Sequence, residues 1–109
     1  MIDLPKVTVS PSFQNAYFGD SLVTITCNVS AIPAAVTLGW RKISLDKQTT
    51  TDIDSTNMDK YLIFNSTLSV KLSITNIDFN DDAHYVCLAQ NAVGTGLSDY
   101  ARVHVRGGK

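Results

Sequence analysis

The stretch that decides the fold is residues 81–87, Asp-Asp-Ala-His-Tyr-Val-Cys, which places carboxylates, an imidazole, a phenol and a thiol within seven positions. Such a set fits a catalytic or metal site, and it equally fits scaffolding. The surrounding residues 83–90 alternate in the way that is typical of a β-strand with one buried face. In such a strand Tyr85 and Cys87 face inward, whereas His84 faces outward and away from the thiol. The alternation favours the scaffold interpretation.

Similar alternations recur along the chain, and turn residues separate them about every ten positions, which is the pattern of an all-β sandwich or barrel. We predict strands over residues 6–10, 22–30, 36–43, 61–64, 66–74, 83–90 and 97–105, with a hairpin turn at 91–94. Residues 44–60 are polar and are expected to be mostly loop, with room for one short edge strand. The predicted inward-facing residues include Leu68, Ala101, Val103 and Val105.

Length and composition limit the class of protein and its partners. With 109 residues, 44% of them hydrophobic, the chain has the size and apolar content of one folded domain, with a core from about residue 5 to residue 106. The net charge of −1 argues against nucleic acid or an anionic membrane as the main partner. No stretch approaches the ~20 apolar residues of a membrane span, and the N-terminus shows no apolar signal segment. We expect residues 1–109 to be a single domain cut from a longer protein with neighbouring domains.

Two cysteines, Cys27 and Cys87, both lie on predicted inward faces. An even pair fits one disulfide bond and an oxidising compartment, although two free thiols fit the count as well. Trp40 is also predicted to face inward, and it follows Cys27 by 13 positions. Tyr85 precedes the second cysteine by two positions. This combination of cysteines, tryptophan and tyrosine is typical of one known sandwich fold.

The sequence resembles the immunoglobulin superfamily over nearly its whole length. The residues that carry the resemblance are Cys27, Trp40, the segment Leu72–Ile74 followed by Ile77, and the motif Asp-x-Ala-x-Tyr-x-Cys within residues 81–87. The resemblance implies an immunoglobulin-like β-sandwich of two antiparallel sheets joined by a Cys27–Cys87 disulfide. It also implies a core that contains Trp40, Leu72 and Tyr85, with the Tyr85 hydroxyl bonded to the backbone upstream.

Residues 87–96, Cys-Leu-Ala-Gln-Asn-Ala-Val-Gly-Thr-Gly, resemble the Cys-x-Ala-x-Asn-x-x-Gly pattern of intermediate-set (I-set) domains. Asn91 and Gly94 would then form a tight turn, with the glycine free to take a positive φ. A variable-type feature is present as well, because Lys60 and Asp81 occupy the positions of an ion pair that such domains often carry. We predict an I-set domain, with a shortened variable-type domain as the alternative.

The same resemblance implies structural roles for residues 81–87, in place of the catalytic or metal-binding roles that their side chains suggest. A disulfide-bonded Cys87 has no thiolate and cannot act as a nucleophile. His84 and His104 are both predicted to face outward, where two histidines are at most weak metal ligands. The sequence has no glycine-rich phosphate loop and no Gly-x-Ser-x-Gly motif. We therefore predict that the chain is not an enzyme and that it binds no metal and no cofactor.

Two N-glycosylation sequons are present, Asn28-Val-Ser and Asn65-Ser-Thr. Asn28 points outward from its predicted strand and Asn65 lies at a predicted turn, so both are sterically suited to carry a glycan. Because Ser and Thr are frequent in this chain, chance also produces sequons, and unmodified surface asparagines are the alternative. Together with the expected disulfide, the sequons favour an extracellular or cell-surface ectodomain.

One face of the predicted sandwich is a candidate interface. On the sheet that carries Trp40 and Cys87, outward residues form a flat apolar patch bordered by basic side chains, as in many protein interfaces. These residues are Gly39, Arg41, Val86, Leu88, Tyr100 and Arg102. The polar segment 44–60 is a second candidate.

These features predict a protein-recognition module of a cell-adhesion or immune-type receptor. We expect its partners to be proteins, bound homophilically or heterophilically through that face. The alternatives are an intracellular structural spacer, similar to the immunoglobulin domains of giant muscle proteins, and a variable-type domain that pairs with a second one.

Overall fold

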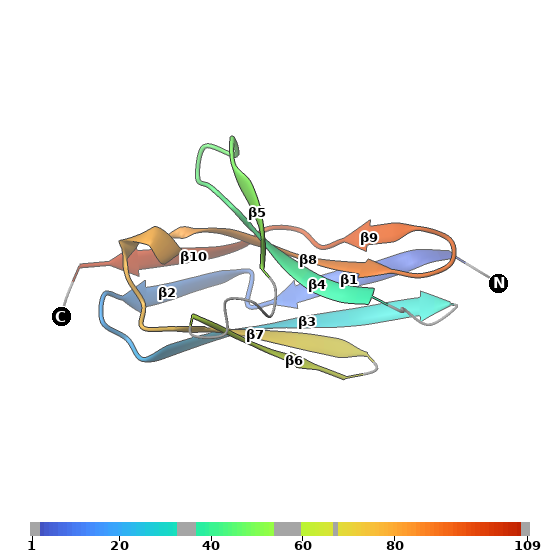
Figure 1. Cartoon of the computed structure of the whole chain (residues 1–109), viewed down its shortest axis with the longest axis horizontal. Coiled ribbons are helices and arrows are strands. Elements are labelled where there is room, and N and C mark those ends of the chain that lie inside the picture. Colours follow the sequence, from blue (N-terminus) through green and yellow to red (C-terminus); the bar gives the residue numbers. More distant parts are fainter. Residues whose placement is uncertain (1–2, 33–36, 54–59, 67, 108–109) are drawn as a thin grey trace.

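The computed structural model describes residues 3–32, 37–53, 60–66 and 68–107, and strands account for most of them (Figure 1). The strands are β1 (Asp3–Ser10), β2 (Phe13–Tyr17), β3 (Leu22–Ile32), β4 (Thr37–Ile43), β5 (Thr50–Ile53), β6 (Tyr61–Asn65), β7 (Ser69–Thr75), β8 (Ala83–Gln90), β9 (Thr95–Leu97) and β10 (Ala101–Arg106). A short 3₁₀-helix, η2 (Phe79–Asp81), lies between β7 and β8.

The strands form two layers that pack face to face (Figure 1). One sheet has four strands in the order β1-β3-β7-β6, and the other has six, in the order β2-β10-β8-β4-β5 with β9 beside β8. Paired strands are antiparallel except β2 and β10, which run parallel. The predicted all-β sandwich is confirmed, with this parallel pair as an addition to it.

The core lies between the sheets and is built from the inward faces that the alternation predicted. Trp40, Leu72 and Tyr85 are among the most deeply buried side chains. The Cys27–Cys87 disulfide crosses from β3 to β8, with the two Cα atoms 6.2 Å apart. Both sulfurs are therefore covalently paired, and the alternative of two free thiols is excluded.

Residues 78–85 form a compact corner at one end of the sandwich. Asp78 caps η2, because its side chain accepts a hydrogen bond from the Asn80 N–H while Asp81 accepts one from the Asp78 N–H. The Tyr85 hydroxyl donates to the Asp81 carbonyl at 2.8 Å. Lys60 Nζ lies 2.7 Å from Asp81 Oδ2. The carboxylates and the phenol of this stretch therefore serve to hold the corner together.

Strand β2 is an element that the sequence pattern did not predict. Its residues, Phe-Gln-Asn-Ala-Tyr, bury only Ala16 fully and leave Phe13 exposed, so the usual alternation is weak. The strand exists because the chain leaves the four-stranded sheet after Ser10 and pairs with β10 in the opposite sheet. That partner lies more than 80 positions away in the sequence, and a local pattern contains no trace of it.

The predicted strand 97–105 is wrong as a single element, because it is broken between β9 and β10. Ser98 fills the break: its N–H donates to the Cys87 carbonyl, and its hydroxyl accepts from the Cys87 N–H, both at 2.9 Å. The break changes which side chains face the core. Ala101, Val103 and Val105 are buried as predicted, but Leu97 lies 56% exposed.

The prediction that Leu68 faces inward is also wrong, since this side chain is 65% exposed. The cause is that β7 begins only at Ser69, so Leu68 lies before the strand. The segment 44–60 contains one short edge strand, β5, as the sequence analysis allowed. Residues 54–59 of this segment lie outside the described part of the chain. The predicted turn at 91–94 is present, with the Asn91 N–H donating to the Gly94 carbonyl.

Candidate protein-binding face

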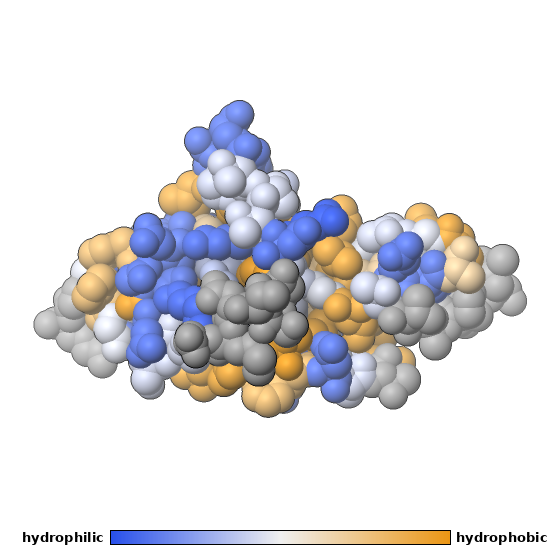
Figure 2. All heavy atoms as spheres, in the orientation of Figure 1, coloured by the Kyte–Doolittle hydropathy of each residue, from blue (hydrophilic) through white to orange (hydrophobic). Residues whose placement is uncertain are grey.

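The outer face of the six-stranded sheet carries a row of apolar residues across three strands. Leu97 on β9 lies opposite Leu88 on β8, which in turn lies opposite Gly39 on β4. A Cβ atom at Gly39 would sit 3.7 Å from Leu88 Cδ1, so the leucine side chain leans over the glycine. Figure 2 shows hydrophobic surface above β8 and β9, beside the projecting β4–β5 hairpin. We call Leu88 and Leu97 the leucine ridge.

Leu97 is a member of this face that the sequence reasoning missed. A continuous strand with Ala101 facing inward would turn Leu97 inward as well. The break at Ser98 reverses that expectation, and Leu97 joins Leu88 on the outside. The polar pair Ser98-Asp99 within the predicted strand was the available signal, but two polar residues do not distinguish a break from ordinary exposed positions.

Val86 does not contribute to this face as predicted, because it is only 3% exposed. Its register partner on β4 is Arg41. Valine is short, and β8 is a central strand between β4 and β10, so neighbouring strands flank this side chain on both sides. The alternation correctly identified the side of the sheet on which Val86 lies, but it did not predict how deeply the side chain is buried. The degree of burial depends on residues of neighbouring strands that lie far away in the sequence.

Tyr100 forms the border of the face next to the β4–β5 hairpin. Its ring, on a side chain that stays 42% exposed, lies 5.1 Å from the His84 ring, and Lys47 Nζ lies 4.9 Å from the Tyr100 ring centre. Lys47 belongs to the turn of the hairpin and has a φ of 62°. A cation over an aromatic ring is attracted by about 0.5–1 kcal/mol at an exposed site. The hairpin turn therefore leans over one side of the face.

The surroundings of His84 favour the neutral form of its imidazole. Its burial lowers the pKa of the imidazole below the usual 6.5, and the positive charges of Arg102 and Lys47 lower it further. The negative charge of Asp82 opposes this shift but is the smallest of the four contributions. A neutral ring at this position is compatible with the lysine close by.

The two predicted basic residues of the face already have partners within the chain. Arg41 Nε lies 2.9 Å from Asp52 Oδ1, in an exposed pair between β4 and β5. Arg102 lies 2.6 Å from Asp82 Oδ1, and His104 Nδ1 lies 3.2 Å from the other oxygen of the same carboxylate. The exposed Arg41–Asp52 pair contributes little energy, whereas the Arg102–Asp82 pair is largely shielded from solvent. Each arginine at the border of the leucine ridge therefore already lies beside a carboxylate of the same chain.

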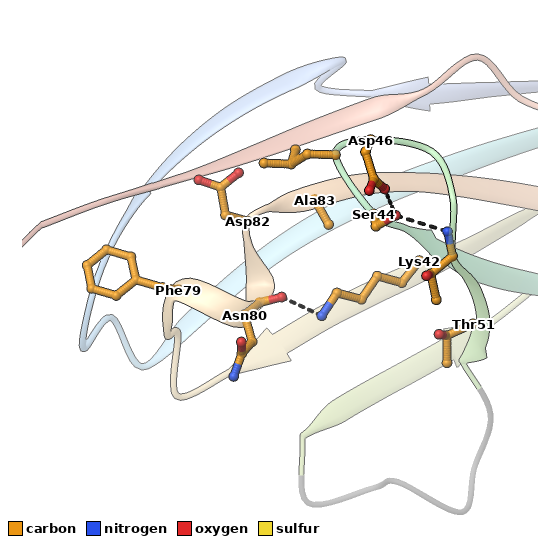
Figure 3. Close-up of a pocket in the computed structure, with 10 residues that line it drawn as sticks. Lys42, Ser44, Asp46, Thr51, Phe79, Asn80, Asp82 and Ala83 are labelled. Atoms are coloured by element: carbon orange, nitrogen blue, oxygen red, sulfur yellow. Dashed lines mark hydrogen bonds between the residues drawn. The ribbon is translucent and has the colours of Figure 1, made fainter.

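A hollow of about 700 Å³ opens on the other side of the hairpin, between β4, β5 and η2. Lys42 crosses it and donates to the Asn80 carbonyl (Figure 3). Two carboxylates line the hollow, and both have partners. Asp82 is paired with Arg102. Asp46 accepts hydrogen bonds from the Ser44 hydroxyl and the Gln48 N–H, which hold the pKa of its carboxyl below the usual value. Among the described residues, no cluster of three histidine, cysteine or acidic side chains could hold a metal ion.

The two sequon asparagines lie on the other layer of the sandwich. Asn28 is exposed on β3, and Asn65 is exposed at the end of β6. Both strands belong to the four-stranded sheet, whereas the leucine ridge belongs to the six-stranded sheet. In the described ranges, no helix is long and apolar enough to cross a lipid bilayer.

Comparison with known proteins agrees with this fold. The family described as Immunoglobulin domain matches residues 5–91. Neural cell adhesion molecule 1 of Bos taurus is 36% identical to this chain over 92 residues, which are 83% of this chain and 10% of that protein. The chain thus spans about a tenth of the length of this relative. The match over most of the chain, together with the disulfide and the two-layer fold, confirms the resemblance: the chain belongs to the immunoglobulin domain family.

Proposed function

We propose that this chain is an extracellular recognition domain of an adhesion-type receptor and that it binds a protein partner through the leucine ridge. The observation that carries the proposal is the row of Leu97, Leu88 and Gly39 on the outer face of the six-stranded sheet. The similarity to a neural cell adhesion molecule supports the adhesion class. The pattern in residues 87–96 supports the I-set type within the family.

The composition of the face supports binding to protein rather than to another class of partner. An apolar centre with a polar and aromatic border is the usual anatomy of a protein interface. Here the leucines form the centre, while Tyr100, Arg41 and Arg102 form the border. The net charge of −1 gives no electrostatic attraction for nucleic acid or anionic lipid. Binding would work by burial of surface, without chemistry on the partner.

The disulfide supports an extracellular location. A cystine between the two sheets persists in oxidising surroundings, such as the cell surface, and is rare in the cytosol. An ectodomain built of several domains would place neighbouring domains of the same chain beside this one. The partner is then either a second copy of the chain on another cell or a different surface protein.

The first experiment measures binding of the oxidised domain to itself and to cells. Sedimentation velocity across a wide concentration range detects a second copy as partner, and fluorescent tetramers of the domain detect a partner on cultured cells. We expect Leu88→Asp and Leu97→Asp to abolish whichever binding the unmodified domain shows. Leu68→Asp is the matched control, because Leu68, like Leu97, is more than half exposed, and it lies on the four-stranded side. Binding that survives both ridge variants, or that Leu68→Asp removes equally, would contradict the proposal.

A further inference from the structure

We infer that Lys47, Tyr100 and His84 form an acid-sensitive latch, which holds the turn of the β4–β5 hairpin over the outer face of the six-stranded sheet. At neutral pH the ammonium group of Lys47 lies over the Tyr100 ring, and protonation of His84 beside the same ring releases it. The inference concerns a response of this chain alone and goes beyond the proposed partner binding.

The hydrogen bonds within the hairpin turn fix its shape but not its position. The Lys47 N–H donates to the Ser44 carbonyl at 2.8 Å, and the Ser44 N–H donates to the Thr49 carbonyl at 2.9 Å. These bonds join residues of the turn to one another, while the hairpin itself projects from the sandwich (Figure 1). The position of the turn over the sheet therefore depends on contacts between side chains. Lys47 supplies such a contact, because its Nζ atom lies 4.9 Å from the centre of the Tyr100 ring.

The Tyr100 ring is shared by two side chains that can carry a positive charge. The His84 ring lies 5.1 Å from the Tyr100 ring, on which Lys47 also rests. An aromatic ring attracts a cation, so a charged imidazolium would compete with the ammonium group for the same ring. Lys47 is the side chain that is free to leave, because it is exposed in a turn, whereas His84 is partly buried on the central strand β8.

The groups that face His84 from the neighbouring elements disfavour its charged form. Burial has the largest effect on the pKa of His84, and it holds this pKa below the usual value of 6.5. Arg102, its register partner on β10, and Lys47 on the hairpin turn lower the pKa further by their positive charges. Its register partner on β4 is Ile43, which carries no charge. Asp82 raises the pKa, and its effect is the smallest of the four.

The carboxylate of Asp82 is already engaged by other groups. Arg102 lies 2.6 Å from its Oδ1 atom, while Oδ2 lies 3.2 Å from His104 Nδ1 and accepts from the Val105 N–H at 3.0 Å. In the described part of the chain, Nδ1 of His84 is buried and has no hydrogen-bond partner. Both ring nitrogens of an imidazolium carry a proton, so protonation would leave a buried donor without an acceptor. The surroundings must therefore move to accommodate the charge.

The coupling between His84 and Lys47 acts in both directions. Since the charge of Lys47 in its place over the Tyr100 ring disfavours protonation of His84, a charged His84 must weaken the binding of Lys47 at that place by the same free energy. Histidine changes its charge between about pH 5 and 8, where ordinary carboxylates remain charged. The release should therefore occur at mildly acidic pH, and it should follow the titration of His84 alone.

The experiment follows the Lys47 side chain by nuclear magnetic resonance in a domain labelled with ¹³C-lysine, from neutral pH to about pH 5. Protons above an aromatic ring resonate upfield, so we expect an upfield shift of the Lys47 ε-methylene protons at neutral pH, which Tyr100→Leu removes. Acidification should abolish this shift with the same midpoint as the imidazole C–H resonances of His84 in the same sample. In His84→Gln the upfield shift should persist to the lowest pH.

Two control variants separate the latch from general effects of acid. His104→Gln removes the other histidine of the chain, which lies beside Asp82, and it should leave the acid-induced change at Lys47 in place. Lys47→Gln should raise the midpoint of the His84 titration, as the reverse coupling requires. Lys71→Gln makes the same change on the four-stranded sheet and should leave that midpoint unchanged.

Four results would overturn the inference. They are the absence of an upfield shift at neutral pH, a shift that survives acidification, a midpoint that differs from that of His84, and an acid-induced loss that persists in His84→Gln. The comparison of midpoints uses the unmodified domain, so it decides the matter even where a variant does not fold. Both resonances are measured without a partner protein, so failure of the proposed function would leave the result unaffected.

Discussion

Replacing Lys60 by methionine should destabilise the domain strongly, because it leaves the Asp81 carboxylate buried without a counter-charge. Asp81 is 1% exposed, and Lys60 Nζ lies 2.7 Å from its Oδ2 atom. Within the described part of the chain, Oδ1 of the same carboxylate has no hydrogen-bond partner. Methionine keeps most of the unbranched side chain and removes the terminal ammonium group with its charge and its hydrogen bonds.

The expected magnitude follows from the burial. Breaking a buried ion pair by removing one partner costs about 3–5 kcal/mol, which is a large share of the roughly 5–15 kcal/mol by which domains of this size are stable. The melting temperature should fall by roughly 12 °C or more. Lys71→Met makes the same chemical change at an exposed site on β7, where about 0.5 kcal/mol or less is expected.

The assay is urea denaturation, followed by the fluorescence of Trp40, the single tryptophan of the chain. Adding Asp81→Asn to the Lys60→Met variant removes the uncompensated charge, so the double variant should be more stable than Lys60→Met alone. A Lys60→Met variant within about 1 kcal/mol of the Lys71→Met control would refute the reasoning, since it lies well below the range for a buried pair. A double variant less stable than Lys60→Met would refute the assignment of the effect to the buried charge.

Two further predictions concern packing and pH. Gly96→Ala should destabilise the domain by about 1–3 kcal/mol, because a Cβ atom there would lie 2.1 Å from the carbonyl oxygen of Pro5; Gly107→Ala, where a Cβ meets open space, should leave urea denaturation unchanged. The second concerns His84, whose pKa is lowered in the folded chain, so that the unfolded chain binds the proton more readily. The contribution of His84 to the free energy of unfolding should therefore be fully present above pH 6.5. It should decrease as the pH drops from there towards the pKa of His84 in the folded chain. His84→Gln should flatten this part of a plot of unfolding free energy against pH, and an unchanged slope would count against the assignment.

The part of the fold that could be predicted from sequence is the part that local alternation encodes. Cys27, Trp40, Leu72 and Tyr85 face the core as expected, because inward and outward positions alternate strictly within each strand. Strand β2 could not be predicted, since its pairing with β10 joins segments at opposite ends of the sequence.

The candidate face was only partly predictable for a related reason. The alternation assigned Leu88 and Val86 to the outer side of the sheet, but the burial of Val86 depends on the strands beside it. Leu97 was missed because one residue, Ser98, bonds to Cys87 through both its backbone and its hydroxyl and so reverses the alternation. The sequence therefore predicted the side of the sheet on which Leu88 lies, and the three-dimensional structure was needed to bring Leu97 beside it.

The parallel pairing of β2 with β10 has a mechanical consequence. β1 begins at one end of the long axis of the molecule, and β10 ends at the other (Figure 1). A pull on these two ends draws β2 and β10 past each other along their length, so their evenly spaced hydrogen bonds carry the force together instead of opening one after another. Resistance to such a pull depends on the rate of unfolding rather than on equilibrium stability. A domain stretched between two attachment points would thus keep its two sheets together, and with them the shape of the leucine ridge.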